Sequence, residues 1–143
     1  DHGILAPRDL EPRGFSQAIV EHGGAPDVVI DLVGGAYVTA EVTAIAPAGR
    51  IVIVGTLAGG MPAVPLLGLM QKRAEMHGTV LRPRSVDDKA AATRAFVDEV
   101  VPMLVDGRVR PIVDRVFPID EAEAAYALVE TDTTFGKVIL DAR

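Results

Sequence analysis

The sequence has no cysteine, only two serines and only three histidines, and this scarcity removes several kinds of chemistry. Without cysteine there can be no disulfide, no thiolate zinc site and no cysteine nucleophile. Ser16 and Ser85 lie outside any nucleophile-elbow pattern, so a serine hydrolase has no nucleophile here. His2, His22 and His77 fit no metal-ligand spacing, and we expect no metal site from this chain. A chain without cysteine suits a reducing compartment, and we expect a cytoplasmic location.

Basic residues are in the minority, because 14 lysines and arginines face 20 acidic residues and the net charge is −6. Nucleic-acid binding draws its affinity from clustered basic side chains, so DNA and RNA are not expected partners. No apolar run reaches the roughly 18 to 20 residues that a membrane helix needs, and we expect no membrane partner. The chain begins with Asp1 and no signal-peptide pattern follows, so we expect it to start inside a longer protein.

What the sequence does contain is a succession of apolar segments divided by glycine and proline. In the first half, the spacing predicts helices over residues 14–21 and 36–46 and strands over 27–33 and 51–54. The run at 27–33 is almost continuously apolar, which is typical of a strand buried on both faces. A strand, a short helix and a second strand form a right-handed βαβ unit, so these two strands are predicted to be parallel neighbours. The predicted fold class is α/β with a parallel sheet that is covered by helices on both faces.

The second half continues the alternation of helices and strands. Strands are predicted at 76–81, 112–117 and 137–140, and helices at 65–73, 85–107 and 120–130. Ser85 and Asp88 resemble a capping box at the start of the long helix, and Asp120 is expected to cap the last helix. Pro102 predicts a kink inside the long helix. The predicted core stripe of that helix consists of Ala92, Phe96, Val100, Met103 and Leu104.

Glycines gather where the first two strands end, at Gly34 and Gly35 and again from residue 55 to 60. Their spacing matches neither the G-x-G-x-x-G pattern of dinucleotide-binding proteins nor the Walker loop of nucleoside triphosphatases. In open parallel sheets ligands lie outside the carboxyl ends of the strands, where glycine lets a flat ligand approach the backbone. The alternative is that these glycines only make tight turns. Asp31 is the one acid inside an apolar strand, and we favour a structural carboxylate with a partner over a catalytic acid.

Five segments together carry a resemblance to a known family. They are residues 27–35, 46–55, 78–85, 110–126 and 135–140. In order and spacing they resemble the zeta-crystallin-like NAD(P)H quinone oxidoreductases of the medium-chain dehydrogenase/reductase superfamily. The resemblance implies that residues 1–110 belong to a partial Rossmann domain. It also implies that residues 111–143 return to a GroES-like catalytic domain whose main body lies upstream.

The resemblance also implies a nicotinamide cofactor, NADPH or NADH, held largely by backbone groups. The cofactor-binding positions that it implies are Val33, Gly34 and Gly35 on the adenosine side, and Val54, Gly55, Thr56, Leu81 and Arg82 at the nicotinamide end. Hydride would pass from the nicotinamide to a quinone or enone without zinc, and no catalytic residue is named. The phosphate-binding βαβ unit is missing from this sequence, so we expect the chain alone to be inactive. A homodimer through the strand at 76–81 is also implied.

Two other functions remain open. An enoyl reductase of the same superfamily shares these motifs, and the substrate pocket that would distinguish it lies outside this sequence. A non-catalytic dimerisation module is the second alternative, because the strand at 76–81 would otherwise be an exposed sheet edge.

Overall fold

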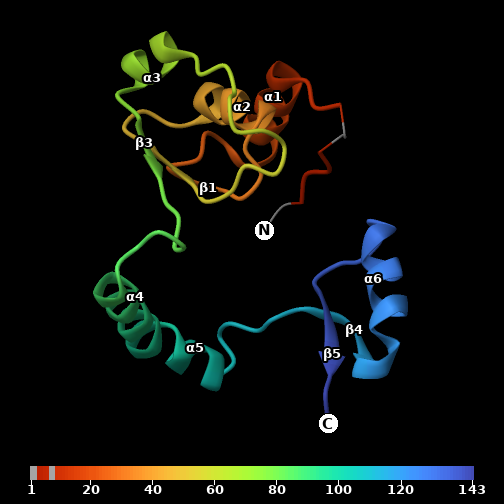
Figure 1. Cartoon of the computed structure of the whole chain (residues 1–143). Coiled ribbons are helices and arrows are strands. Elements are labelled where there is room, and N and C mark those ends of the chain that lie inside the picture. Colours follow the sequence, from red (N-terminus) through yellow and green to blue (C-terminus); the bar gives the residue numbers. More distant parts are fainter. Residues whose placement is uncertain (1–2, 7–8) are drawn as a thin grey trace. The chain divides into compact units, whose positions relative to one another are not determined.

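The computed structural model describes residues 3–6 and 9–143, which fall into two compact units, Asp1–Arg84 and Ser85–Arg143 (Figure 1). Both units combine helices with parallel strands, which confirms the predicted α/β class. The boundary between the units lies at residues 84 and 85, whereas the division expected near residue 110 concerns two domains of a longer protein and stays a prediction.

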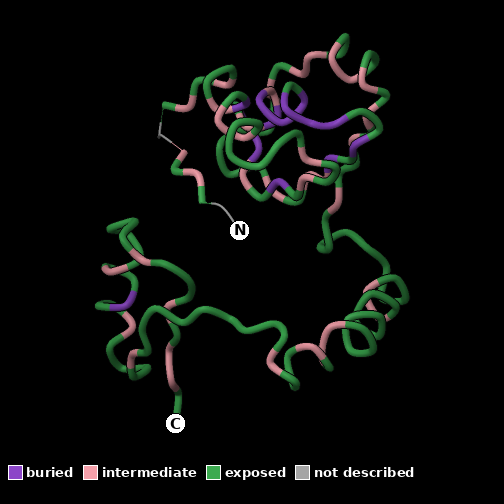
Figure 2. Tube along the Cα trace, turned by 180° about the vertical axis from the view of Figure 1, so that it is seen from behind, coloured by how far each residue is buried: buried purple, intermediate pink, exposed green. Residues whose placement is uncertain are grey.

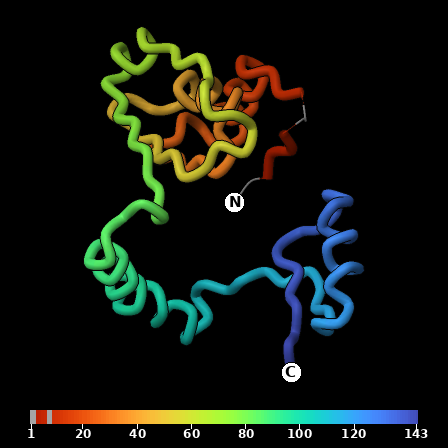
Figure 3. The backbone as a smooth tube through the Cα atoms, in the orientation of Figure 1, coloured from red at the N-terminus to blue at the C-terminus, as the bar shows by residue number. Residues whose placement is uncertain are grey.

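Unit 1 contains a three-stranded parallel sheet and three helices. They follow in the order α1 (Pro12–Gly23), β1 (Val28–Asp31), α2 (Ala36–Ala44), β2 (Arg50–Ile53), α3 (Leu66–Lys72) and β3 (Glu75–Gly78), as Figure 3 traces from red to green. The strand order is β1-β2-β3, with Ile30 opposite Val52 and Val52 opposite His77. The predicted parallel pairing of the first two strands is therefore confirmed. The third strand ends at Gly78, earlier than the predicted Leu81.

Local sequence explains where the first helix begins and ends. The Glu11 carboxylate accepts hydrogen bonds from the backbone N–H groups of Arg13, at 2.9 Å, and of Gly14, and Pro12 supplies a first position that needs no donor. These backbone donors hold the pKa of Glu11 below its ordinary value. Gly24, with φ of 77°, ends the helix. The predicted helix at 14–21 is thus confirmed, and the observed helix is two residues longer at each end.

The core of unit 1 lies on one face of the sheet. Val42 and Ile45 at the end of α2 pack with Ile51 of β2, and all three are fully buried. Because side chains alternate along a strand, the residues at 28 and 30 point to the opposite face, where Val28 is 59% and Ile30 67% exposed. The prediction that β1 is buried on both faces is therefore wrong for this chain. The physical reason is that the packed helices of unit 1 supply a core to only one face.

Unit 2 contains a βαβ unit preceded by a long helix and a short one. The elements are α4 (Val86–Glu99), α5 (Val101–Val105), β4 (Val113–Pro118), η1 (Ile119–Glu121), α6 (Ala122–Glu130) and β5 (Lys137–Asp141), with β4 parallel to β5. The Ser85 hydroxyl accepts from the N–H of Asp88 at 3.1 Å, so this predicted cap is confirmed. The helix is interrupted at Val100, two residues before Pro102, because proline cannot donate a hydrogen bond to the preceding turn.

Two expectations for unit 2 are wrong. Asp120 lies inside η1, and no side chain caps the start of α6. The predicted core stripe of the long helix is not buried, since Phe96 is 48% and Leu104 40% exposed. Figure 2 shows that buried residues gather in unit 1, whereas the described part of unit 2 has a single buried residue, Ala125. Within the described residues, no helix is long and apolar enough to cross a membrane.

Candidate functional site

The candidate site lies at the carboxyl edge of the sheet in unit 1. In a parallel sheet all strands end at the same edge, and β1, β2 and β3 end there at Asp31, Ile53 and Gly78. Ligands of open parallel sheets bind outside this edge. The segments that follow the three strands therefore decide what the site can hold.

The segment after β1 is a turn organised by Asp31. Its Oδ1 atom accepts hydrogen bonds from the backbone N–H groups of Val33 at 2.7 Å and Gly34 at 2.8 Å. Asp31 is only 3% exposed, so these two N–H groups provide Oδ1 with the hydrogen bonds that water would provide on the surface. Asp31 thus has the backbone partners that a structural carboxylate needs on Oδ1 and fixes the turn at residues 33–35, whereas its Oδ2 has no partner within the described residues.

Both glycines of this turn have left-handed backbone conformations, with φ of 71° at Gly34 and 58° at Gly35. The turn docks on the loop that follows β2, since the N–H of Gly35 donates to the carbonyl of Gly59 at 2.9 Å and the N–H of Ala58 donates to the carbonyl of Val33 at 2.8 Å. A Cβ atom on Gly35 would lie 2.4 Å from the Ala58 oxygen. Internal packing therefore already requires these glycines, and their role in cofactor binding stays a prediction.

A cleft of about 340 Å³ opens where β2 and β3 end. Its lining residues come from two short segments and are Ile53, Val54, Gly55, Thr56, Gly78, Thr79 and Val80. Gly55 is needed because a Cβ atom there would lie 2.3 Å from the carbonyl oxygen of Leu32, the residue that follows β1. Gly78, in contrast, faces open space at its Cβ position. The Thr79 hydroxyl accepts a hydrogen bond from Arg84 Nη2 at 2.7 Å, so an arginine closes one side of this segment.

Only some of the expected cofactor positions line this cleft. Val54, Gly55 and Thr56 line the cleft, whereas the turn at 33–35 lies against the neighbouring loop. Leu81 and Arg82 are exposed and do not line it. Thr79 and Val80 line it instead, although the sequence pattern predicted that they belong to the third strand. No sequence signal marks the end of this strand at Gly78, which the observed register with β2 fixes.

A second missed residue is Glu41, a carboxyl group only 6% exposed on α2. Burial first, and the nearby Asp31 charge second, raise the pKa of Glu41 to about 7. The pattern of α2 contained the signal, because Glu41 follows Val38 by three residues and therefore lies on the buried side of the helix.

The histidines and acidic residues of the described chain form no cluster of metal ligands. Within residues 3–6 and 9–143, no group of three or more histidine, aspartate or glutamate side chains could hold a metal ion. His22 and His77 lie apart, with His22 bonded to the Ala18 carbonyl and His77 to Glu75. His2 lies outside the described residues. The donor set of the described chain therefore does not fit a zinc ion.

Comparisons with known proteins agree on a family. The family profile described as zinc-binding dehydrogenase matches residues 9–140. Quinone oxidoreductase-like protein 2 of Bos taurus is 29% identical over 117 residues, which cover 82% of this chain and 33% of that protein. The chain thus spans about a third of the length of the relatives that it matches.

Solved structures give the same result. A Sinorhizobium meliloti protein provisionally assigned as an alcohol dehydrogenase superposes with a TM-score of 0.70 and 27% identity, covering 94% of this chain and 35% of that one. The 2-octenoyl-CoA carboxylase reductase CinF, solved with NADP and 2-octenoyl-CoA, superposes with a TM-score of 0.64 and 25% identity, covering 90% and 27%.

Proposed function

The chain belongs to the zinc-binding dehydrogenase family of the medium-chain dehydrogenase/reductase superfamily, and from this premise we propose that it is part of an NAD(P)H-dependent quinone oxidoreductase. In this proposal the chain contributes half of the nucleotide-binding sheet. The rest of the cofactor and substrate site comes from the remaining two thirds of a longer protein.

The observation that carries the proposal is the cleft at the carboxyl ends of β2 and β3. Gly78, whose Cβ position faces open space, leaves part of its wall without a side chain, so a flat ring can approach the backbone. Thr56 and Thr79 offer hydroxyl groups at its rim. These residues fit a nicotinamide ring, and they would hold it by packing and by hydrogen bonds to its carboxamide and ribose. When bound, the cofactor supplies a hydride for the reduction of the substrate.

The proposed substrate class is a quinone or an enone. Both accept a hydride at an electron-poor carbon or oxygen, and a proton from solvent completes the two-electron reduction. The bovine relative supports the quinone, because its printed description is that of a quinone oxidoreductase-like protein. The specific observation that favours an enoyl reductase instead is the likeness to CinF, which was solved with an enoyl-CoA substrate. The described residues offer no zinc donor set, so in this proposal the described part of the chain contributes no metal ligand.

The cleft can be tested on the chain itself by saturation-transfer NMR with NADPH and NADH. Gly78→Val should weaken the transfer to the nicotinamide protons, because the new side chain enters the cleft without clashing with the protein. The matched control is Gly60→Val, another open glycine position that does not line the cleft. Equal signals in both variants would remove this cleft from the cofactor site.

Activity is a separate test. Loss of NADPH absorbance with 1,4-benzoquinone should be absent for the chain alone and present for a longer protein that contains this chain and a complete phosphate-binding unit. A longer protein that is inactive with several quinones but reduces enoyl thioesters would favour the enoyl reductase. Turnover by the chain alone would contradict the expected need for the missing half.

The proposal includes a homodimer in which β3 pairs with its two-fold mate. Within the described residues β3 is an edge strand, with β2 as its one strand neighbour, and unpaired edges invite such pairing. Light scattering at tens of micromolar should then give twice the monomer mass, and a monomer would count against this interface.

A further inference from the structure

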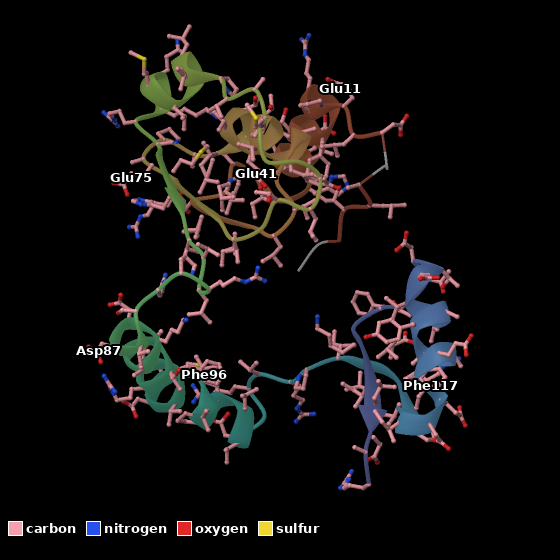
Figure 4. All side chains as sticks on the ribbon, viewed as in Figure 1. Glu11, Glu41, Glu75, Asp87, Phe96 and Phe117 are labelled. Atoms are coloured by element: carbon pink, nitrogen blue, oxygen red, sulfur yellow. The ribbon has the colours of Figure 1, made fainter. Side chains whose placement is uncertain are left out.

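The two edges of the sheet in unit 1 differ in the chemistry of their exposed side chains. On β1, Val28 and Ile30 are 59% and 67% exposed, so this edge presents apolar side chains that need cover from further chain. On β3, the exposed side chains are those of Glu75 and His77, at 61% and 60%. Figure 4 labels Glu75 at the outer side of β3. These polar side chains need no apolar cover, and what the β3 edge offers a partner is its backbone and this acid and histidine.

Alternate residues of β3 direct their backbone groups toward β2. The N–H of Glu75 donates to the carbonyl of Gly49 at 2.9 Å. The N–H of Thr79 donates to the carbonyl of Ile53, also at 2.9 Å. Met76 alternates with these positions, so its N–H and C=O groups point to the free side of the strand. Facing residues of an antiparallel ladder either both exchange hydrogen bonds or both do not, so a two-fold axis between two copies of β3 passes through a residue.

The residue on the axis decides which side chains face each other. If the axis passes through Glu75 or His77, two identical side chains that carry charge face each other, and like charges in that position destabilise a ladder. If it passes through Gly78, His77 faces Thr79 of the partner subunit. An axis through Met76 places Glu75 opposite the partner's His77 at both symmetric positions. Pairs of an acid and a base across the strands stabilise such a ladder, so this register is the most complementary one.

We propose that two copies of this chain pair antiparallel through β3 about a two-fold axis at Met76, with Glu75 of each copy bonded to the partner's His77. The inference rests on the homodimer of the proposed function and specifies its register and its contacts. Within one chain, His77 Nε2 lies 3.2 Å from Glu75 Oε2. A carboxylate has two accepting oxygens and an imidazole has two ring nitrogens, so each pair has capacity for a second bond across the interface. The Met76 side chain lies on the other face of the sheet, against the core.

Disulfide cross-linking tests the register directly, because the chain has no cysteine and every disulfide must join introduced residues. Facing residues that do not exchange hydrogen bonds have Cα atoms about 4.5 Å apart, which suits a disulfide, whereas diagonal neighbours are about 7 to 8 Å apart. An equimolar mixture of Glu75→Cys and His77→Cys chains, oxidised with glutathione disulfide, should therefore give the mixed dimer, identified by its intact mass. Leu57→Cys, at a site that is 90% exposed in a loop outside β3, measures cross-linking by collision. We expect the mixed dimer at about fivefold this level or more, and each β3 variant alone near it.

Charge exchange is the second measurement. Glu75→Lys removes both acids that face His77 of the partner subunit and should weaken dimerisation about tenfold in analytical ultracentrifugation. The double variant Glu75→Lys/His77→Glu restores an acid opposite a base, so its affinity should return to within about threefold of the wild type. Circular dichroism checks that each variant is folded.

The outcomes separate this register from the homodimer itself. A dimer that persists while the mixture cross-links only at the collision level, or while His77→Cys alone cross-links most, overturns the register and leaves the homodimer of the proposed function standing. A double variant that dimerises as weakly as Glu75→Lys also overturns the pairing of Glu75 with the partner's His77. A wild-type chain that light scattering finds to be a monomer contradicts the homodimer and the register together.

Discussion

Replacing Glu41 with glutamine should make the chain more stable at alkaline pH and change its stability much less at acidic pH. Glu41 is buried on α2, and its pKa is raised from an ordinary 4.5 to about 7 by burial and by the Asp31 charge. The folded state therefore binds the proton more tightly than the unfolded state. Below pH 4.5 both states are protonated and Glu41 imposes no charge penalty.

The magnitude follows from the shift. Between pH 4.5 and 7 the unfolded chain ionises Glu41 while the folded chain does not, so stability falls as pH rises and levels off above pH 7. A rise to about 7 corresponds to about 3 kcal/mol at full effect. Between about pH 5 and pH 8.5 the accessible part is roughly 2 to 3 kcal/mol. Glutamine has no such dependence, and its own packing cost cancels when the two pH values are compared.

Urea denaturation of the wild type and Glu41→Gln at both pH values measures this difference directly. The free-energy gain of the variant should be larger at pH 8.5 than at pH 5 by roughly 2 to 3 kcal/mol. Glu75→Gln, at an exposed site, should show no comparable change. A gain that is the same at both pH values would refute the assignment of a raised pKa to Glu41, whatever its size.

Three further substitutions follow from the geometry. Gly35→Ala places a Cβ atom 2.4 Å from the Ala58 oxygen at a φ of 58°, so it should destabilise the chain by more than about 1 kcal/mol in urea denaturation. A smaller loss would show that the turn can move away. Ser85→Ala removes the hydroxyl that accepts from Asp88 and should cost about 1 kcal/mol, with a loss of helical circular dichroism; unchanged helicity would mean that the cap is dispensable. Lys72→Met leaves two carbonyls at the end of α2 without their ammonium donor, so it should lower the thermal midpoint, and an unchanged midpoint would argue that water replaces the lysine.

Much of unit 1 could be predicted because its signals are local. The apolar runs, the glycines between them and the βαβ handedness rule were enough to give parallel β1 and β2. The burial of these elements could not be predicted in the same way. A continuous apolar run indicates that a strand is covered on both faces, but it does not say which chain segment provides the cover. Val28 and Ile30 are exposed because no described segment of this chain covers their face of β1.

The candidate site was predictable in position and less so in detail. The carboxyl ends of the strands follow from the order of elements, and Val54 to Thr56 were found by that rule. Thr79 lines the cleft and Leu81 does not, because β3 ends at Gly78 rather than at residue 81. The ends of strands are the part of a sequence pattern that is hardest to predict. Glu41 was missed because a helical stripe was traced through its apolar members alone, although the same periodicity places the acid on the buried side.

The pair of backbone hydrogen bonds between the turn at 33–35 and the loop at 56–59 has a consequence for any ligand that reaches the sheet edge. These bonds, Gly35 to Gly59 and Ala58 to Val33, fasten an exposed glycine-rich loop before a ligand arrives. Ordering a flexible backbone costs about 1 to 2 kcal/mol of entropy per residue. A ligand that lies against Gly55 and Thr56 contacts a loop whose backbone was already ordered during folding, so binding loses little further backbone entropy. Binding energy at this edge can then appear as affinity, as is usual for preorganised sites.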